Sequence, residues 1–318
     1  MRTSTDRCPG VLRVHDAVDG GLARVRVPGG YLSAAQVSAL AAASASFGDG
    51  SLDLTSRGNV QLRGLRDGAA PRVAEVLSDA GLLPSATHDT ARNIVASPLL
   101  DLREVVAELD AGVQALDPLP GRFLLGVGST DVLSVRPDLA LVDGRLAVDG
   151  FDAGPSNVSG LLETADHFLS LRGTAWRVRE IAWDRPLGPA LPVGSPVALG
   201  RHGGSVVALP PLGRLTPEML DQLSAVDVQL TPWRSVVVPA STSLEGFVTD
   251  PASPWVGVSA CAGTACASSL ADVRADAVAE LGPGPRPLHW SGCARHCGAP
   301  AGAVVRTATA EGYVVSEV

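Results

Sequence analysis

The sequence predicts an α+β protein that is built from two copies of one unit. Residues 27–57 and residues 209–234 each place proline and glycine before a capped helix, and each then runs into a strand that ends in Leu-Thr followed by an arginine. Element order, turn chemistry and strand ending agree between the two segments, which chance would rarely arrange. The second segment has one more residue between its threonine and its arginine. Each copy is followed by a stretch that mixes helix and strand patterns, so we expect two halves that each contain two α+β units.

The predicted helix of the first copy begins after Ser33. Ser33 and Gln36 have the spacing of a capping box, and Val37 and Leu40 fall on one helical face. A Gly-Asp-Gly turn then leads into the extended stretch 52–57.

The second copy repeats this order with different capping residues. Thr216 is the expected N-cap and Pro217 the first helical residue, and the apolar face holds Met219, Leu220 and Leu223. The best candidate for a linker between the two halves is the proline- and glycine-rich stretch 187–196.

A further helix is expected between the two copies. Asp101 and Glu104 have the spacing of another capping box, and the helix would run from there towards Leu116.

Composition excludes several classes of protein. The chain has 318 residues, 46% of them hydrophobic and 18% charged, which is typical of a globular protein with a sizeable core. A net charge of −8 argues against nucleic acid as a partner. No apolar run approaches the roughly 18–20 residues that a membrane span needs, and residues 1–6 lack the apolar stretch of a secretory signal. We therefore expect a soluble, cytoplasmic protein that does not bind membranes.

Four of the five cysteines fall in two close pairs near the end of the chain. The spacing is Cys261-x4-Cys266 and Cys293-x3-Cys297. Four thiolates in two pairs suit either tetrahedral zinc or an iron–sulfur cluster, and the wide spacing with a helix in the gap favours the cluster. Buried inert cysteines are the weaker alternative. Cys8 stands alone, and we expect it to be a small apolar residue.

The expected helix in the gap begins just after the second cysteine of the first pair. Ser268 or Ser269 would cap it, its amino end would point at the cysteine, and Gly282 would stop it. Its expected buried face consists of Leu270, Val273, Ala277 and Leu281. The glycines beside the second pair are expected to offer N–H groups to sulfur, and His289 and His296 to form hydrogen bonds near the site, although either could ligate iron or donate a proton.

Several motifs occur in the order that the nitrite and sulfite reductase superfamily shows. They are Asp19-Gly20-Gly21-Leu22-Ala23-Arg24-Val25-Arg26-Val27-Pro28-Gly29-Gly30, Leu54-Thr55-Ser56-Arg57-Gly58-Asn59-Val60-Gln61-Leu62-Arg63-Gly64, Thr90-Ala91-Arg92-Asn93-Ile94 and His289-Trp290-Ser291-Gly292-Cys293. The chain resembles this superfamily over nearly its whole length and, within it, resembles the precorrin-3B synthase family.

The resemblance implies a duplicated nitrite/sulfite reductase-like architecture. Two ferredoxin-like half-domains would span residues 15–85 and 198–245, and two cluster- or tetrapyrrole-type α+β domains would span residues 86–185 and 246–318. The four paired cysteines would hold a [4Fe–4S] cluster. By resemblance, Arg26, Arg57, Arg63 and Arg92 would bind the tetrapyrrole, and Asn59, Asn93 and Arg122 would act in catalysis. A structural hydrogen bond is the alternative role for either asparagine.

Three departures separate the chain from the siroheme-dependent reductases. A segment that supplies two lysines to the inorganic anion there reads Leu119-Pro120-Gly121-Arg122-Phe123-Leu124 here, so that Arg122 keeps one cation and Leu124 replaces the other. The first cysteine pair is one residue shorter than usual in the reductases, and the chain itself is shorter.

The resemblance to the precorrin-3B synthase family accommodates all three departures. It implies an oxygen-dependent monooxygenase of aerobic cobalamin biosynthesis that converts precorrin-3A to precorrin-3B by hydroxylation and lactone formation. Oxygen, an electron donor (an NADH-linked reductase or a ferredoxin) and a mononuclear non-heme iron are then expected as well. The alternatives are a siroheme-dependent sulfite or nitrite reductase and a zinc-stapled tetrapyrrole-binding protein without catalysis.

Overall fold

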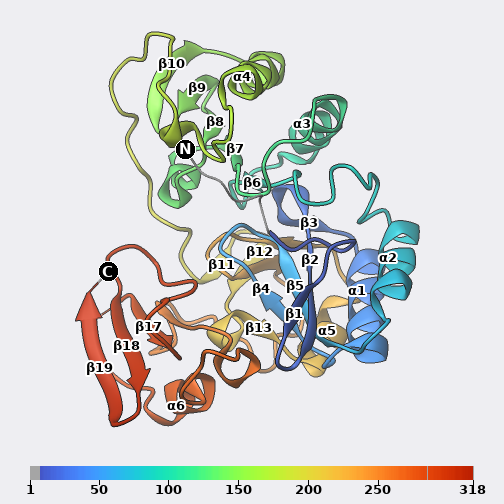
Figure 1. Ribbon diagram of the computed structural model, residues 1–318, viewed down its shortest axis with the longest axis vertical. Helices are drawn as coiled ribbons and strands as arrows, with labels where there is room; N and C mark the ends of the chain where they lie inside the picture. Colours follow the sequence, from blue (N-terminus) through green and yellow to red (C-terminus); the bar gives the residue numbers. More distant parts are fainter. Residues whose placement is uncertain (1–7, 285, 318) are drawn as a thin grey trace.

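The chain folds into four β-sheets with helices packed against them (Figure 1). The computed structural model describes residues 8–284 and 286–317. Within those residues no helix is both long and apolar enough to cross a membrane. The expected α+β architecture is confirmed.

Two five-stranded antiparallel sheets form the duplicated units. The first contains, in spatial order, β1 (His15–Ala17), β2 (Gly20–Val25), β5 (Val60–Leu65), β4 (Leu52–Leu54) and β13 (Arg214–Leu215). The second contains β11 (Gly200–His202), β12 (Ser205–Ala208), β15 (Val236–Pro239), β14 (Val228–Leu230) and β3 (Tyr31–Leu32). The last strand of each sheet comes from the other half of the chain, so the two units exchange one strand each.

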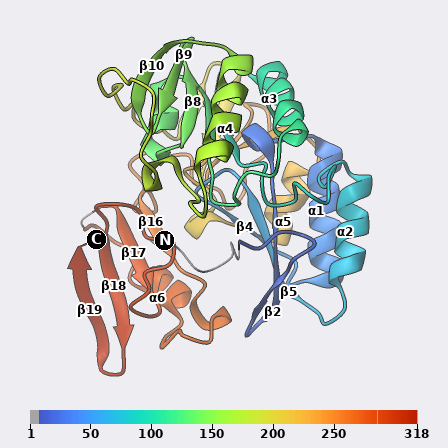
Figure 2. The same ribbon diagram turned by 45° about the horizontal axis from the view of Figure 1, so that its top comes forward.

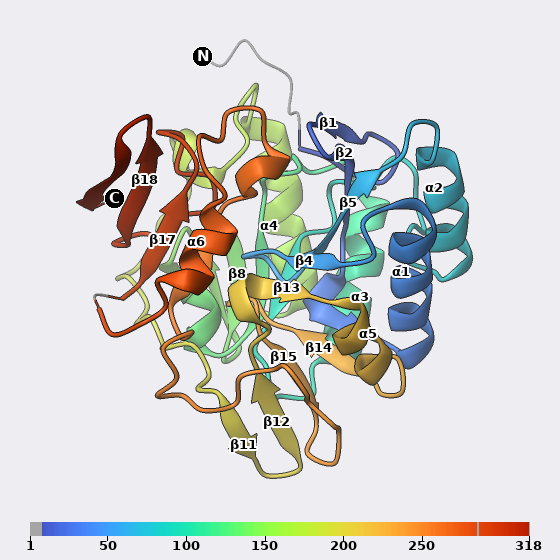
Figure 3. The ribbon, with the colours of Figure 1, turned by 90° about the horizontal axis from the view of Figure 1, so that it is seen from below.

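The two sheets share one hydrophobic core. Leu40 and Leu62 from the first unit are fully buried, and they belong to the same cluster as Val206 and Leu220 from the second. Helices α1 (Ala34–Phe47), α2 (Ala70–Asp79) and α5 (Pro217–Leu223) lie side by side on the outer face of this pair (Figure 3). Burial of each large apolar side chain contributes about 1.5–3 kcal/mol, so a common core binds the two halves into one folding unit.

The turns that end the two repeated strands differ from the sequence prediction. In each turn the threonine N–H bonds to the carbonyl four residues on, and the N–H three residues on bonds back to the threonine. The third residue has a positive φ in both copies, 64° at Gly58 and 60° at Arg234. Arg57 therefore corresponds to Trp233, and Arg234 corresponds to Gly58. The additional residue between threonine and arginine in the second copy is therefore not an insertion, because the turns are equally long and the arginines occupy different positions in them.

Two of the four predicted helix caps are confirmed. Ser33 forms the capping box with Gln36 at the start of α1, and the Thr216 side chain accepts a bond from the third residue of α5. The box predicted at Asp101 is wrong. Helix α3 (Arg103–Ala115) begins later, with Leu102 at the N-cap and no side-chain capping bond, so that Asp101 lies outside the helix.

The other two sheets also repeat one pattern. One contains β6 (Ile94–Ala96), β7 (Leu125–Gly128), β8 (Leu139–Val142), β9 (Arg145–Val148) and β10 (Phe151–Pro155). The other contains β16 (Val258–Ala260), β17 (Leu288–Ser291), β18 (Val304–Thr309) and β19 (Gly312–Glu317). In each sheet three neighbouring strands run parallel and the fourth is antiparallel. The duplication thus extends to these sheets.

An α-helix connects the first two parallel strands of each of these sheets. Helix α3 joins β6 to β7, and α6 (Val273–Ala279) joins β16 to β17. Helix α4 (Val158–Leu171) follows β10 and packs beside α3 (Figure 2). The predicted linker 187–196 lies in an irregular, largely exposed stretch that runs between the two halves (Figure 1).

Candidate functional site

The two cysteine pairs lie at one edge of the sheet β16–β19. Cys261 directly follows β16, and Cys293 comes two residues after the end of β17. Because these two strands are adjacent and parallel, their carboxyl ends meet at the same edge of the sheet, where open α/β sheets bind ligands. The fold thus brings together cysteines that are distant in the sequence.

The thiols influence one another electrostatically. Burial raises the pKa of the Cys297 thiol, and the charges of Cys293, Cys261 and Cys266 raise it further. Cys297 therefore lies close enough to the other three cysteines to interact with them electrostatically.

The predicted helix in the cysteine gap is displaced. It begins at Val273 and is capped by Asp272, because the residues after Cys266 form turns rather than a first helical turn. Leu270 is 63% exposed, so its predicted burial is wrong, whereas Val273 and Ala277 are buried as expected. The first turn of α6 lies against the loop between Cys261 and Cys266, where Arg274 Nε donates to Cys261 O at 3.2 Å.

Backbone N–H groups stabilise one sulfur. Cys261 Sγ accepts bonds from Gly263 N at 3.4 Å and from Gly292 N at 3.2 Å. A Cβ at Gly292 would lie 1.9 Å from Ser269 Oγ, so only glycine allows this approach. The expectation that Gly292 donates to sulfur is confirmed, and such donors favour a thiolate ligand.

The described residues do not present a ready-made site for a single metal ion. Within residues 8–284 and 286–317, no three His, Cys, Asp or Glu side chains converge closely enough to hold one metal ion. A tetrahedral zinc requires four sulfurs at about 2.3 Å from one centre. A cubane gives each thiolate its own iron, so the sulfurs stand further apart. The mononuclear iron expected from the resemblance is not tested by these residues, and no step below depends on one.

Three arginines fix the cysteine loops to other parts of the protein. Arg63 donates to Ala265 O at 3.3 Å, and Arg274 donates to Cys261 O at 3.2 Å. Arg234 Nη2 donates to Gly298 O at 3.2 Å, directly after the last cysteine. Each of these bonds ties a loop of the β16–β19 sheet to a residue outside that loop.

A cavity of about 820 Å³ opens beside the second cysteine loop. This volume is within the range of about 300–1,000 Å³ that is usual for small-molecule sites. Its walls come from both halves of the chain and include Ser56, Arg57, Ser134, Arg136, Leu199, Trp233, Arg234, Ser259, Gly298 and Pro300.

Three arginines give the cavity a positive field. Burial lowers the pKa of Arg57 to about 10, so that this guanidinium remains protonated at neutral pH, and burial also lowers the pKa of Arg234. Arg136 and Arg234 also have positive φ angles of 52° and 60°. Such a conformation is uncommon for residues other than glycine and clusters at functional sites.

Sequence reasoning missed Arg136, Trp233 and Arg234. The signal for the last two was their place in the repeated turn, opposite Arg57 and Gly58. Nothing in the sequence around Arg136 indicates that it reaches the same cavity.

Of the four arginines predicted to bind substrate, only Arg57 lines this cavity. Arg92 is 6% exposed and forms two bonds of 2.7 and 2.8 Å to Asp110, so that its charge is already neutralised. Arg63 pairs with Asp19 in the same manner, at 3.1 and 3.2 Å. Arg26 is 2% exposed and donates to two backbone carbonyls.

Asn59 and Asn93 are each 1% exposed and bond to one another, Nδ2 to Oδ1, at 3.0 Å. Asn59 Oδ1 accepts a bond from Val27 N, and Asn93 Nδ2 donates to the carbonyls of Thr90 and Gly121. Their amides are therefore occupied within the protein. This geometry favours the structural role over the catalytic one.

Residues 119–124, the segment that lacks the two lysines of the reductases, place Leu124 in the core and Arg122 at the surface. Leu124 is 1% exposed and packs in a hydrophobic cluster with Val132 and Ala140. Arg122 is exposed, with its guanidinium 4.9 Å from the centre of the Trp176 ring. The position that carries a second lysine elsewhere thus points into the core here.

The two histidines form hydrogen bonds near the cysteines, as expected. His289 is fully buried and bonds through Nδ1 to Ser259 Oγ at 2.9 Å, and His296 Nε2 bonds to Thr307 Oγ1 at 2.8 Å. Burial, followed by the charges of Arg234 and His296, lowers the pKa of His289 to about 4. His289 is consequently neutral at neutral pH.

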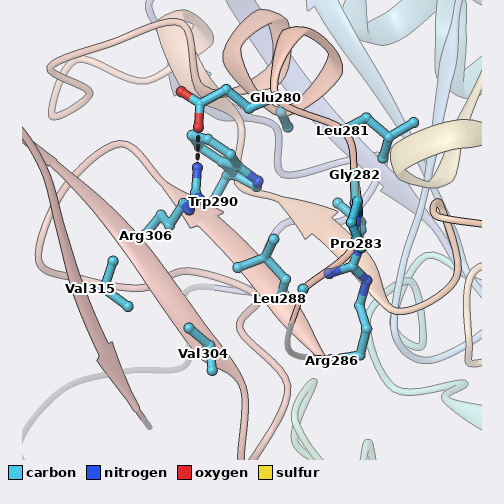
Figure 4. A pocket seen from close by; sticks show the side chains of 13 residues that line it. Glu280, Leu281, Gly282, Pro283, Arg286, Leu288, Trp290, Val304, Arg306 and Val315 are labelled. Carbon is cyan, nitrogen blue, oxygen red and sulfur yellow. Dashed lines mark hydrogen bonds and ion pairs between the residues drawn. The ribbon is translucent and has the colours of Figure 1, made fainter.

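A smaller cavity of about 270 Å³ lies on the outer part of the β16–β19 sheet (Figure 4). Arg306 there forms an ion pair with Glu280 and stacks over the Trp290 ring at 4.6 Å. Because Glu280 neutralises Arg306 and the guanidinium of Arg286, also in the lining, donates to three backbone carbonyls, this cavity offers less to a charged ligand than the larger one.

Comparison with known proteins agrees with this fold. Residues 15–80 match the nitrite/sulfite reductase ferredoxin-like half domain. The chain is 26% identical to a precorrin-3B synthase from Sinorhizobium sp, over 92% of this chain and 78% of that protein. It is 27% identical to a ferredoxin–nitrite reductase from Synechococcus elongatus, over 88% of this chain and 74% of that protein.

A solved structure, the Mycobacterium tuberculosis NirA protein, has the same fold with a TM-score of 0.63 and 19% identity. The similarity covers 87% of this chain and 69% of that one. The predicted resemblance to the superfamily and to precorrin-3B synthase is confirmed.

Proposed function

We propose that this chain is a redox enzyme that carries a [4Fe–4S] cluster on Cys261, Cys266, Cys293 and Cys297 and converts precorrin-3A to precorrin-3B. One observation carries the proposal. A cavity of about 820 Å³ with three arginines in its wall opens beside the loop that holds the second cysteine pair.

The charge of the cavity supports a polycarboxylate ligand. Guanidinium groups pair with carboxylates through two parallel hydrogen bonds, and such pairs strengthen when they are removed from water. Arg57, Arg136 and Arg234 would bind acidic side chains around the edge of a tetrapyrrole. Trp233 donates from Nε1 to Ser134 Oγ at 3.2 Å, which fixes its ring at the cavity wall as an apolar surface for the macrocycle.

The proposed reaction needs oxygen and two electrons. One atom of O₂ enters the product at a meso carbon, and an acetate side chain closes to a lactone. The other oxygen atom leaves as water with two electrons and two protons from an external donor, an NADH-linked reductase or a ferredoxin. A cluster on the four cysteines would pass these electrons one at a time, and the protein's own groups orient the substrate and exclude water.

The relatives support the same reading at different levels. The precorrin-3B synthase and the nitrite reductase both align with most of this chain, which makes a redox role for the fold the common element. Leu124 favours the precorrin-3B synthase function over the nitrite reductase function. A cation that would bind and protonate nitrite or sulfite contributes through its charge in the site, and a leucine buried in the core offers none.

A siroheme-dependent sulfite or nitrite reductase is the second candidate function, because the alignment with the Synechococcus protein covers so much of the chain. Siroheme would bring a strong visible absorption band to the protein as purified. If the protein is instead a zinc-stapled tetrapyrrole-binding protein without catalysis, metal analysis should find zinc and no acid-labile sulfide.

The deciding experiment uses protein purified without oxygen. Iron and acid-labile sulfide should be present in equal amounts, and electron paramagnetic resonance of the reduced protein should show a cluster signal. Incubation with precorrin-3A and an electron donor should leave the substrate unchanged until oxygen is added, and should then give a product that is heavier by one oxygen atom. An unchanged substrate mass in oxygen, with the cluster intact, would refute the proposed reaction.

A further inference from the structure

Arg136 lies in the cavity wall with a backbone conformation that its place in the sequence disfavours. It ends the 3-10 helix η2 (Thr130–Val135), has φ 52° and ψ 61°, and is followed by Pro137. A residue with a Cβ avoids this left-handed region, and a following proline pushes a residue towards extended backbone. Such a conformation persists only where the surrounding structure fixes it. The contacts of Arg136 must therefore outweigh both preferences.

Two guanidinium groups hold the Arg136 carbonyl. Arg177 Nη2 donates to Arg136 O at 2.8 Å, and Arg179 Nη2 donates to the same oxygen at 3.0 Å. The Arg136 N–H is also engaged, because it donates to Leu133 O at 3.0 Å. Hydrogen bonds from charged donors are shorter and stronger than those between neutral groups. Arg177 and Arg179 thus form a clamp on the backbone of Arg136.

The first arginine of the clamp is anchored in the core. Arg177 Nε lies 2.7 Å from Asp138 Oδ2, and Asp138 is fully buried. The same carboxylate accepts the backbone N–H groups of Leu124 and Val178, both at 2.9 Å. Because this carboxylate is held on several sides, Arg177 has little freedom to leave the Arg136 carbonyl.

The second arginine of the clamp is more exposed. Arg179 Nη2 lies 3.3 Å from Asp149 Oδ1, and the Arg179 side chain is 28% exposed. Arg177 is the N-cap of the 3-10 helix η3 (Val178–Glu180), and Arg179 lies within it. One short helix therefore presents both guanidinium groups to one carbonyl oxygen.

The clamp leaves the guanidinium of Arg136 available to a ligand. The two acids near the clamp are engaged, Asp138 by Arg177 and Asp149 by Arg179. Within residues 8–284 and 286–317 no acid forms an ion pair with the Arg136 side chain, which is exposed where it lines the cavity of about 820 Å³. An anionic group of a ligand in this cavity would supply the partner for its charge.

We infer that Arg177 and Arg179 are positioning residues, which hold Arg136 in its strained conformation so that its guanidinium binds a peripheral carboxylate of the ligand. The inference rests on the proposed function, because it takes a tetrapyrrole with acidic side chains as that ligand. Relaxation of Arg136 to extended backbone would turn both its carbonyl and its side chain in other directions. Loss of the clamp should thus weaken binding through Arg136.

The test is a double-mutant cycle on ligand binding. Protein purified without oxygen, with its cluster content determined, is titrated with uroporphyrin, a macrocycle with acidic side chains around its whole edge, and the quenching of tryptophan fluorescence gives Kd. Arg136→Gln should weaken binding about 10-fold or more, as loss of a charged hydrogen-bond partner does. Arg179→Gln should weaken it about 5-fold, the lower end of the roughly 5- to 30-fold preference against left-handed backbone.

The double variant decides whether Arg179 acts through Arg136. In the Arg136→Gln background, Arg179→Gln should weaken binding no further, because the side chain that it positions has already lost its charge. An equal weakening in both backgrounds, no weakening by Arg179→Gln alone, or failure of the wild-type protein to bind uroporphyrin would each overturn the inference.

Arg172→Gln is the matched control. Arg172 Nε also donates to a backbone carbonyl, that of Ala175 at 3.0 Å, and neither residue lines the cavity. This variant should leave the Kd for uroporphyrin unchanged. A weakening as large as that of Arg179→Gln would show that the clamp has no special role, and would overturn the inference.

A second pair of variants tests the strain directly. Arg136→Gly and Arg136→Ala both remove the guanidinium, but glycine alone accepts left-handed backbone without steric cost, so Arg136→Gly should have the higher unfolding midpoint in urea. The reverse order would overturn the inference even if Arg179→Gln did not fold. Uroporphyrin binding without conversion of precorrin-3A would count against the proposed reaction alone, whereas additive effects of Arg136→Gln and Arg179→Gln in an active enzyme would count against the clamp alone.

Discussion

Replacement of Asp53 by asparagine should destabilise the protein more than any exposed charge change. Asp53 lies on β4, is 6% exposed, and binds Arg214 of β13 at 3.0 Å and Arg274 of α6 at 2.9 Å. Arg63 of β5 approaches it at 4.0 Å. One carboxylate thus joins the two repeated units and the cysteine-bearing domain.

The expected size of the effect follows from this geometry. Removal of one partner from a buried ion pair costs about 3–5 kcal/mol, because the remaining charge is left uncompensated. The side chains of Arg214 and Arg274 are 29% and 25% exposed, so water recovers part of that cost. We expect Asp53→Asn to lower the free energy of unfolding by about 3 kcal/mol at pH 7.

The effect should disappear in acid. Burial alone would raise the pKa of the Asp53 carboxyl, but Arg274, Arg214 and Arg63 outweigh it and hold the pKa below its ordinary value. A group whose pKa is lowered on folding stabilises the protein above its unfolded pKa, about 3.9, and loses that contribution as the pH falls through the folded value. The wild-type protein should therefore approach the variant in stability below about pH 3.9.

Urea unfolding of both proteins at several pH values measures this difference. Glu75→Gln is the matched control, because its ion pair with Arg72 is exposed and worth less than about 1 kcal/mol. A loss below about 1 kcal/mol for Asp53→Asn at pH 7, or a difference that does not change with pH, would refute the argument.

Three further predictions concern the cysteines, the cavity and one turn. Cys293→Ala should lose iron and acid-labile sulfide while secondary structure, measured by circular dichroism, is kept. Arg57→Gln should raise KM for the tetrapyrrole by about 10- to 100-fold with little loss of stability, whereas Arg92→Gln should chiefly lower the unfolding midpoint in urea, since its partner is internal. Gly30→Ala should destabilise the protein by more than Gly68→Ala, for which roughly 1 kcal/mol is expected because both glycines have a positive φ. Only at position 30 would the added Cβ also meet a carbonyl oxygen, at 1.9 Å. Equal unfolding midpoints for the two variants would contradict this.

Local signals in the sequence predicted much of the fold. Ser33 and Thr216 cap their helices because each needs only its own side chain and the N–H three residues on. The cap predicted at Asp101 failed for the complementary reason, since packing of α3 decided where the helix begins. The predicted burial of Leu270 is wrong because the chain after Cys266 forms turns and not a helix.

Partners of the charged residues were beyond the reach of sequence. Arg63 and Arg92 stand in motifs that resemble ligand-binding ones, but Asp19 and Asp110 neutralise them in the folded chain. Which arginine keeps its charge for a ligand depends on where the acids fall in three dimensions. Arg57 could be predicted from its motif, whereas Arg136 reaches the cavity through a long-range contact that no pattern reports.

The duplicated turns carry different residues at the same position, so the two copies contribute differently to the site. The first copy places Gly58 at the position of positive φ, where glycine bears no steric cost, and the second places Arg234 there. A residue other than glycine in this conformation costs about 1–2 kcal/mol. Arg234 also donates to Gly298 O beside the last cysteine and lines the cavity. The exchanged strands β3 and β13 fix the two sheets in one arrangement. Arg234, in the second turn, is therefore held at a fixed distance from the first turn. Arg234→Gly should therefore stabilise the turn yet weaken both the attachment of the cysteine loop and the binding of an anionic ligand.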